Sequence, residues 1–279
     1  MTPASPMLQH GEVRACWYED TGVYRILSGS SLMTKCSPHI HETYTVAFLK
    51  RGPATISIGG NDLFWMPYTA LLINPYEIMS CSHDSWFEYD VCYPPKQFMD
   101  EVARRLDSDM PLKFAAPLVS GPVGKKIGDI LASLIGGPRG AKSPVSAEQE
   151  LMQLIIGNAG LLLSRDKASA SQGCVGQARD LIEKLLQEEI SVSELSKLVN
   201  QSRSHFTRRF HRATGLSPSD YIRQIRLARG LSQIQRGAGL ADTALIMGFA
   251  DQAHFTREFK KVYGTTPGKL VRDIARSYG

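Results

Sequence analysis

The sequence has no long apolar run. Nowhere in its 279 residues do about 18 apolar residues follow one another, the length that a membrane-spanning helix needs. The longest apolar segment, residues 151–163, is interrupted by polar residues and glycines. The first ten residues, MTPASPMLQH, also lack the basic region followed by an apolar one that marks a secretory signal. We therefore expect a cytoplasmic protein with no membrane partner.

Cysteine is also scarce. The five cysteines are odd in number, widely spread and without a CxxC pair, which argues against a zinc ribbon and a disulfide framework. They are Cys16, Cys36, Cys81, Cys92 and Cys174. We expect them to be mostly reduced thiols that act as small buried residues. One alternative gives them a function: if Cys81 and Cys92 lie close together on adjacent strands, they form a redox sensor.

Charge, by contrast, is ordinary in amount but unevenly distributed along the chain. Apolar residues make up 43% and charged residues 21% of the chain, as in ordinary folded proteins. Residues 1–176 carry 15 Lys and Arg against 17 Asp and Glu, whereas residues 177–279 carry 17 against 10. The C-terminal part is therefore basic, and this charge favours a polyanionic partner.

The hydrophobic pattern changes from strands to helices near Pro95. Short runs rich in β-branched and aromatic residues, separated by turn signals, predict a sandwich or a barrel. These runs are residues 44–49, 54–58, 71–73 and 86–91. After Pro95 the apolar residues follow helical spacing. The first module is therefore predicted to be β first and then α.

A small, polar segment divides the chain in two. Residues 164–176 are rich in Gly and Ser and have no apolar periodicity, which is typical of a flexible linker. We predict a two-domain α+β protein, with a sensing domain at residues 1–163 and an all-helical domain at residues 177–279.

The helical domain contains an internal repeat. The segment HFTRRF at residues 205–210 recurs as HFTREF at residues 254–259, a shift of 49 residues, and the Gly and Pro that follow are shifted equally. Seven of fourteen aligned positions are identical. A repeat at this distance indicates a duplicated supersecondary unit.

Each copy is predicted to form a helix, a tight turn and a second helix. In the first copy, Ser191 and Glu194 have the form of a capping box, and Ser202 is a good N-cap for the second helix. Phe206 and Phe210 lie four residues apart on that helix and are expected to face inward. Cationic and polar residues lie on the other faces of this helix.

The second copy repeats this pattern. Asp251 is the expected N-cap of its second helix, and Phe255 and Phe259 are the inward pair. Residues 221–235 are expected to form a helix that connects the two units. The sequence therefore predicts a tandem helix-turn-helix.

This arrangement is suited to reading DNA. A helix-turn-helix places its second helix in the major groove, where Arg and Gln can each bond two atoms of a base. The candidates for base reading are Arg208, Arg257 and Gln252, with Ser204 and Thr207 as adaptable neighbours. Cations suited to phosphate contacts, which position the protein without specifying sequence, are Arg203, Arg209, Arg212, Lys260 and Lys261. The alternative is a solvated helix face, which the twin copies make less favoured.

The segment GLADTALIMGFADQAHFTREFKKVYGTTPGKL resembles the second helix-turn-helix signature of AraC/XylS-type transcriptional regulators. Residues 177–279 are similar to that family's tandem DNA-binding domain in length and order. The resemblance implies that both recognition helices enter successive major grooves on one face of double-stranded DNA. It implies these base-facing positions: Ser204, Thr207, Arg208, Gln252, Ala253 and Arg257. Thr243 departs from the pattern, because an aliphatic residue is more usual there.

Residues 20–95 resemble, more loosely, the usual N-terminal module of the same family, a cupin-like β-barrel with trailing helices. The residues that carry this resemblance are Pro38-His39-Ile40-His41, Gly52, Pro67 and Leu72-Ile73-Asn74-Pro75. The resemblance implies a small-molecule effector. His39 and His41 alternate onto one strand face, and with Thr45 and Glu77 they are the candidate pocket residues.

Two histidines alone make an incomplete metal site. Metal-binding cupins add a carboxylate, for which residues 43–46 offer none, and a further histidine, near whose expected place Met79 stands. We therefore expect no metal and no cofactor. The remaining alternative is that His39 and His41 are hydrogen-bonded barrel residues.

An apolar stripe around residues 148–163 predicts a helix that can meet a second copy of the chain. The residues expected at this homodimer contact are Leu151, Ile155 and Leu162. Packing on the protein's own barrel is the alternative.

Together these patterns favour a regulator rather than an enzyme. The resemblance implies a transcription factor, most often an activator that contacts RNA polymerase, which binds DNA specifically and responds to a small molecule. The alternative is a metal-dependent cupin enzyme or a cysteine redox sensor fused to a DNA-binding domain.

Overall fold

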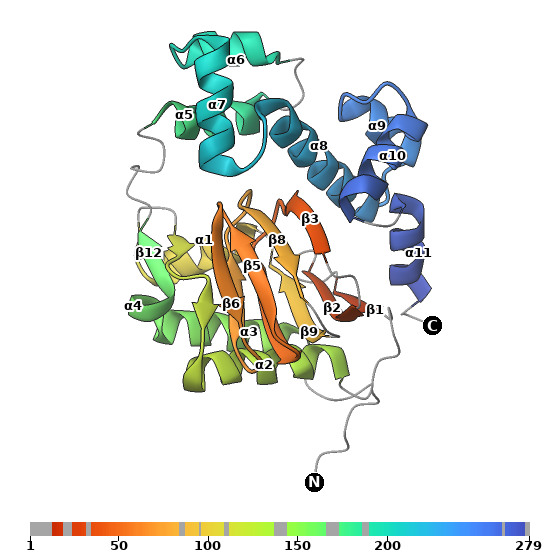
Figure 1. Ribbon diagram of the computed structural model, residues 1–279. Coiled ribbons are helices and arrows are strands. Elements are labelled where there is room, and N and C mark those ends of the chain that lie inside the picture. Colours follow the sequence, from red (N-terminus) through yellow and green to blue (C-terminus); the bar gives the residue numbers. More distant parts are fainter. Residues whose placement is uncertain are drawn as a thin grey trace.

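The computed structural model describes residues 13–18, 24–31, 35–83, 87–94, 96–108, 112–136, 144–165, 173–185, 190–263 and 266–276. The chain is a two-domain α+β protein, with a β-rich N-terminal part and a helical C-terminal part that lies above it in Figure 1.

The described strands of the β-rich part form three sheets. The six-stranded sheet has the order β1-β2-β9-β4-β7-β11, the four-stranded sheet has the order β3-β8-β5-β6, and β10 pairs with β12. The strands are β1 (Val13–Tyr18), β2 (Tyr24–Ser31), β3 (Lys35–Ile40), β4 (Thr45–Arg51), β5 (Ala54–Ile58), β6 (Asn61–Trp65), β7 (Ala70–Ile73), β8 (Ile78–Ser82), β9 (Phe87–Tyr93), β10 (Leu112–Phe114), β11 (Leu118–Val119) and β12 (Leu163–Arg165).

The six-stranded sheet is buried on both faces, which explains the continuous apolar runs in its central strands. Successive side chains of a strand point to opposite faces. Ala47 and Leu49 of β4 pack with residues of the four-stranded sheet. Val46 and Phe48 of the same strand pack instead against the helices on the other face. One strand thus contributes to two hydrophobic cores.

Four helices cover the outer face of the six-stranded sheet: α1 (Lys96–Arg105), α2 (Gly121–Gly136), α3 (Pro144–Gly157) and α4 (Ala159–Leu162). Gly128 lets α2 approach this sheet closely. A Cβ atom at this position would lie 2.6 Å from the ring of Phe48.

The segment predicted as a linker is partly structured. Ser164 and Arg165 belong to β12, which pairs with β10, and Cys174 begins α5 (Cys174–Lys184). Residues 166–172, the rest of that segment, lie outside the described residues.

The helical part contains the predicted pairs of helices. Its helices are α5, α6 (Val192–Leu198), α7 (Arg203–Thr214), α8 (Pro218–Gln235), α9 (Leu240–Ile246), α10 (Gln252–Tyr263) and α11 (Pro267–Arg276). Helix α8 joins two separate cores. Tyr221 and Ile225 of its first half pack with α5, α6 and α7, whereas Leu227 and Leu231 of its second half pack with α9 and α10. The predicted connecting helix is therefore confirmed.

Within the described ranges, no helix is both long enough and apolar enough to cross a membrane.

Candidate nucleic-acid interface and inter-module cavity

The first helix pair forms as its sequence predicts. The Ser191 hydroxyl accepts a hydrogen bond from the Glu194 backbone N–H, and the Glu194 carboxylate accepts one from the Ser191 N–H, which completes the capping box. These bonds lower the pKa of Glu194. Ser202 caps α7, and Phe206 and Phe210 are fully buried. The capping and the inward aromatic pair are thus confirmed.

The buried aromatics turn the polar face of α7 toward solvent. Ser204 and Arg208, predicted to read bases, are exposed, and Thr207 is half-buried. The cations predicted to contact phosphates are also exposed on this helix: Arg203, Arg209 and Arg212.

The second pair is built in the same way. Gly248 has a φ of 74°, which glycine adopts without strain, and it makes the turn before α10. Asp251 Oδ1 accepts the His254 backbone N–H at 2.6 Å, as expected of an N-cap. Phe255 and Phe259 are fully buried. The side chains predicted to face DNA are exposed: Gln252, Ala253, Arg257, Lys260 and Lys261.

Lys261 differs from Lys260 in its surroundings. Its Nζ lies 2.5 Å from Oε1 of Glu258, whose Oε2 lies 3.1 Å from Nε of Arg223. The hydrogen bond from Lys261 is the main cause that lowers the pKa of Glu258. Any phosphate that approached Lys261 would therefore have to compete with Glu258 for it.

Thr243, the departure from the family pattern, is 1% exposed in the core of the second unit. Among the residues that the structure describes, none forms a hydrogen bond with its Oγ1. A buried hydroxyl without a hydrogen bond lowers the stability of the fold.

The four candidate pocket residues, His39, His41, Thr45 and Glu77, have different surroundings in the structure. The Nε2 atoms of His39 and His41 are 3.1 Å apart, and the His39 ring lies 6.3 Å from the ring of Tyr263 on α10. The two histidines therefore lie near the helical part. Thr45 is buried on β4, and Glu77 alone of the four lines the cavity described next.

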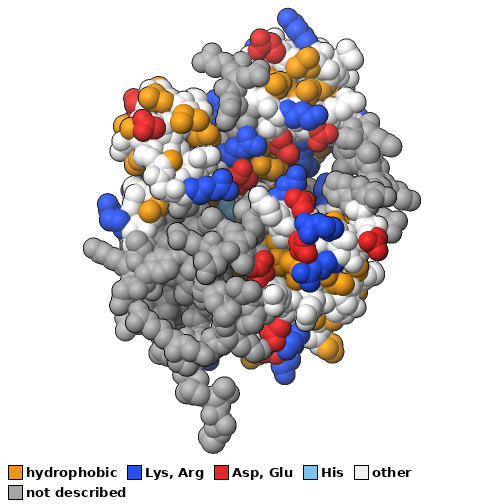
Figure 2. All heavy atoms as spheres, turned by 180° about the vertical axis from the view of Figure 1, so that it is seen from behind, with side chains coloured by type: hydrophobic (Ala, Val, Ile, Leu, Met, Phe, Trp, Pro, Cys, Tyr) orange, Lys and Arg blue, Asp and Glu red, His pale blue; other side chains and the backbone are white. Residues whose placement is uncertain are grey.

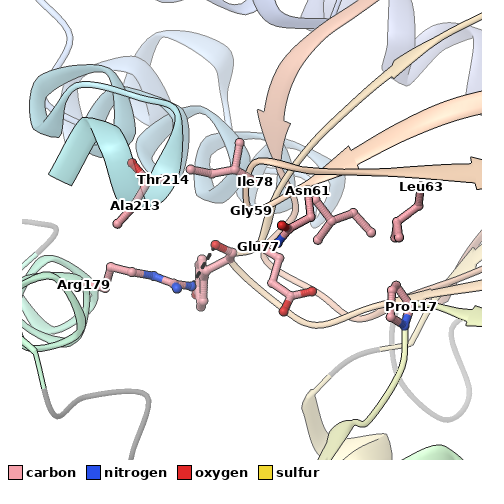
Figure 3. A pocket seen from close by; sticks show the side chains of 11 residues that line it. Gly59, Asn61, Leu63, Glu77, Ile78, Pro117, Arg179, Ala213 and Thr214 are labelled. Atoms are coloured by element: carbon pink, nitrogen blue, oxygen red, sulfur yellow. Dashed lines mark hydrogen bonds between the residues drawn. The ribbon is translucent and has the colours of Figure 1, made fainter. Parts of the chain in front are cut away.

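A cavity of about 500 Å³ lies between the two parts of the chain. Figure 3 shows Arg179 of α5 and Thr214 of α7 on one side, and Glu77, Asn61 and Pro117 from the β-rich part facing them. Further apolar lining comes from Ile58, Leu63, Ile78 and Ala213. The cavity thus combines an apolar lining with one cation and one carboxylate.

Beside the cavity, the turn before β8 is bonded to the helical part. Arg179 Nη2 donates to the Tyr76 carbonyl at 3.1 Å, and Arg179 Nε donates to the Tyr221 hydroxyl at 3.0 Å. Burial is the main cause that raises the pKa of Tyr221, and it raises the pKa of Tyr76 to about 12. Both phenols therefore stay protonated at neutral pH.

Strand β3 is the second contact between the two parts. Gln224 Nε2 donates to the Pro38 carbonyl at 2.5 Å, and the Tyr263 hydroxyl donates to the Ile40 carbonyl at 3.4 Å. The Ile40 side chain is fully buried in the core of the first helix-turn-helix unit. Helices α8 and α10 thus rest on this strand (Figure 1).

An ion pair also joins the two parts. Arg229 Nε of α8 lies 3.2 Å from Oε1 of Glu42, just after β3. The residues joined by these described bonds are 103 to 223 positions apart, so the sequence carries no local signal for them. The Arg and Gln residues of α8 could be placed on a helix but not assigned to a partner.

The residues predicted for dimerisation lie inside the N-terminal part. Leu151, Ile155 and Leu162 are at most 2% exposed and pack in the core between the helices and the six-stranded sheet. Packing within the protein's own N-terminal part is the alternative to dimerisation given in the sequence analysis. A second chain can reach these side chains only if that core opens.

The prediction that Cys81 and Cys92 lie on adjacent strands is wrong. Cys81 is on β8 of the four-stranded sheet, where it stands opposite Cys36 of β3 on one side and Ile56 on the other. Cys92 is on β9 of the other sheet, and its burial raises its pKa far above the usual range. The strand order, which is not visible in sequence, explains the error.

In the described part of the chain, no group of three or more His, Cys, Asp and Glu residues is arranged to hold a metal ion. Seen from behind, cationic and anionic side chains are intermixed over the described surface (Figure 2).

Comparisons with known proteins agree with this architecture. Residues 23–155 match the family described as AraC-like ligand binding domain, and residues 195–273 match a helix-turn-helix domain family. An HTH-type transcriptional regulator of Bacillus subtilis, YbfI, is 22% identical over 226 residues, covering 80% of this chain and 82% of that protein.

Solved structures show the same fold. ToxT from Vibrio cholerae O395 superimposes with a TM-score of 0.58 at 12% identity, covering 90% of this chain and 98% of that chain. The structure of ToxT from strain SCE256 with an unsaturated fatty acid bound gives a TM-score of 0.56 at 12% identity over 88% of this chain and 94% of that chain. With a ligand-binding domain and a tandem helix-turn-helix in this order, the chain belongs to the AraC-type transcriptional regulators.

Proposed function

We propose that this regulator reads DNA with the two exposed faces of α7 and α10. The supporting observation is that both helices bury a Phe pair and present their N-terminal polar residues to solvent. The base-reading residues of the proposal are Ser204, Thr207, Arg208, Gln252, Ala253 and Arg257. One half of helix α8 packs in each helix-turn-helix unit, so this helix sets the spacing between the units.

The test is selection of bound duplexes from a random DNA library with the full chain, followed by fluorescence anisotropy. Arg257→Ala should weaken binding to the selected sequence by about 1–3 kcal/mol and relax preference at one base position. Lys125→Ala, which removes an exposed cation of α2, is the charge-matched control and should leave affinity unchanged. Equal losses for both variants would contradict the assignment of Arg257.

The effector of the proposal is a small organic molecule bound in the cavity between the two parts. The cavity has the volume of ordinary ligand sites. Its lining combines apolar side chains with the Arg179 guanidinium and the Glu77 carboxylate, so the ligand has an apolar body and a polar end. ToxT has been solved with an unsaturated fatty acid and with a naphthalenyl butenoic acid. Organic acids of this kind are therefore the first compounds to test.

A thermal-shift screen of such acids against the full chain provides the test. Leu63→Trp fills the cavity and should abolish the shift caused by a bound acid. Leu161→Trp, at an exposed leucine of α4, should keep the shift. If the shift persists in Leu63→Trp, the ligand binds elsewhere.

Such a ligand regulates DNA binding only if it prefers one arrangement of the two parts. The contacts of Arg179 and Arg229 hold one such arrangement. We further propose that the two large sheets form a cupin-like barrel and that the protein acts by binding rather than by catalysis. We also propose that it forms a homodimer and activates transcription through RNA polymerase. These four points rest on the family resemblance.

A further inference from the structure

Two of the five cysteines stand directly opposite each other on neighbouring antiparallel strands. Cys36 of β3 is the register partner of Cys81 of β8. Directly opposite residues have Cα atoms about 4.5–5.5 Å apart, within the range of about 4.4–6.8 Å that a disulfide needs. We propose that Cys36 and Cys81 form a reversible disulfide, and that this bond is an oxidant-sensitive modification site next to the docking surface of the helical part.

The spacing also indicates that such a bond is easily reduced. Opposite Cβ atoms in a sheet are about 4.5–5.5 Å apart, whereas a disulfide favours about 3.5–4.5 Å. At the longer end of that range, closing the bond pulls the two strands together and strains them. Strained disulfides are the labile and regulatory ones.

Because Cys36 lies on the strand that α8 and α10 contact, a disulfide there can affect DNA binding. The register of β3 against β8 shifts between Cys36 and His39. The carbonyl of Pro38, within this shift, accepts the hydrogen bond from Gln224 of α8. The carbonyl of Ile40, at the end of the strand, accepts the one from Tyr263 of α10. A covalent bond at Cys36 thus fixes the strand on which both helices rest.

The oxidant is a peroxide, and the reaction balances with it. The sulfur of Cys81, which is half-buried, attacks one peroxide oxygen, breaks the O–O bond and becomes a sulfenic acid, while the other oxygen leaves as water. The sulfur of Cys36 then attacks the Cys81 sulfur and displaces the hydroxyl, which leaves as a second water. The two thiols lose two electrons and both protons, and the peroxide is reduced to two waters.

The test uses the purified full chain, reduced and then treated with hydrogen peroxide. After the remaining thiols are blocked, we expect mass spectrometry to find the Cys36–Cys81 cross-linked peptide, and dithiothreitol to release it. Cys81→Ser and Cys36→Ser should each lose the cross-link. Cys174→Ser, at a half-buried cysteine of α5, is the matched control and should keep it. The absence of this cross-link, or a link between other cysteines, overturns the proposal.

The consequence for DNA binding rests on the proposed function, whereas the bond itself does not. We expect the oxidised chain to bind its selected DNA at least threefold more weakly than the reduced chain, because fixing β3 restricts the adjustment of α8 and α10 on the duplex. Cys81→Ser should show no such difference. If the cross-link forms while the affinity of the oxidised chain stays unchanged, its regulatory role is refuted. If the reduced chain selects no DNA at all, the DNA-reading proposal fails and the cross-link result still stands.

Discussion

Replacing Thr243 by valine should stabilise the second helix-turn-helix unit. Thr243 is 1% exposed on α9, and no described residue bonds its Oγ1. A buried hydroxyl without a hydrogen bond costs about 1–3 kcal/mol in mutational data. Valine has nearly the same shape and puts a methyl group in its place. Because helix propensities of Thr and Val are similar, we expect a net gain of about 1 kcal/mol.

Urea unfolding of the full chain, followed by circular dichroism at helical wavelengths, measures this gain. The midpoint should rise without a change in the slope of the free energy against urea. If the helical part unfolds as a unit of about 100 residues, the melting temperature should rise by about 4–8 °C.

Thr214 offers a matched control, because it is also buried but fully bonded. Its Oγ1 donates to the Phe210 carbonyl at 2.8 Å and accepts the Leu216 backbone N–H at 3.2 Å. Thr214→Val should therefore cost about 1–2 kcal/mol, since it leaves the partly buried Leu216 N–H without its acceptor. If Thr243→Val lowers the midpoint as Thr214→Val does, the hydroxyl of Thr243 has a partner and our reasoning is refuted.

Three further predictions address the helical part. Gly230→Ala should destabilise the chain by about 1–2 kcal/mol in urea unfolding, because a Cβ there would lie 2.8 Å from the buried Phe255 ring, whereas Gly160→Ala, with open space around it, should be neutral or stabilising. Lys260→Ala should weaken binding to all DNA sequences alike and lower the salt slope by about one, and Lys261→Ala should do so less, since Lys261 already pairs with Glu258; equal slopes for both variants would contradict this. Glu258 has a lowered pKa, so its stabilisation is complete above its unfolded pKa near 4.5 and is lost as the pH falls through the lower folded value. Glu258→Gln should therefore flatten the acid side of the stability profile, and an unchanged profile would exclude this role.

The helical part could be predicted closely from sequence because its determinants are local. Capping at Ser191, Ser202 and Asp251 involves residues three positions apart, and each inward Phe pair involves residues four positions apart. Such signals are complete within one or two helical turns. The repeat then showed that two such units exist.

The structure of the β-rich part could be predicted from sequence less completely. Strands β4, β5, β7 and β9 were expected from their apolar runs. Strand β6 was not, because it lies between two of those runs, directly after a turn at Gly59 and Gly60. The pairing of Cys81 with Cys36 rather than with Cys92 depends on strand order. Alternation of side chains does not specify which strands are neighbours.

By itself, then, the sequence determined the two modules, the helix pairs, their caps and the polar faces that they present. Only the tertiary structure decided where the modules meet, and there it places a cavity lined by Arg179 and Glu77. The physical reason is range. Caps and helical faces follow from neighbours along the chain, whereas the bonds from Arg179 to Tyr76 and from Gln224 to Pro38 join residues that meet only when both domains have folded.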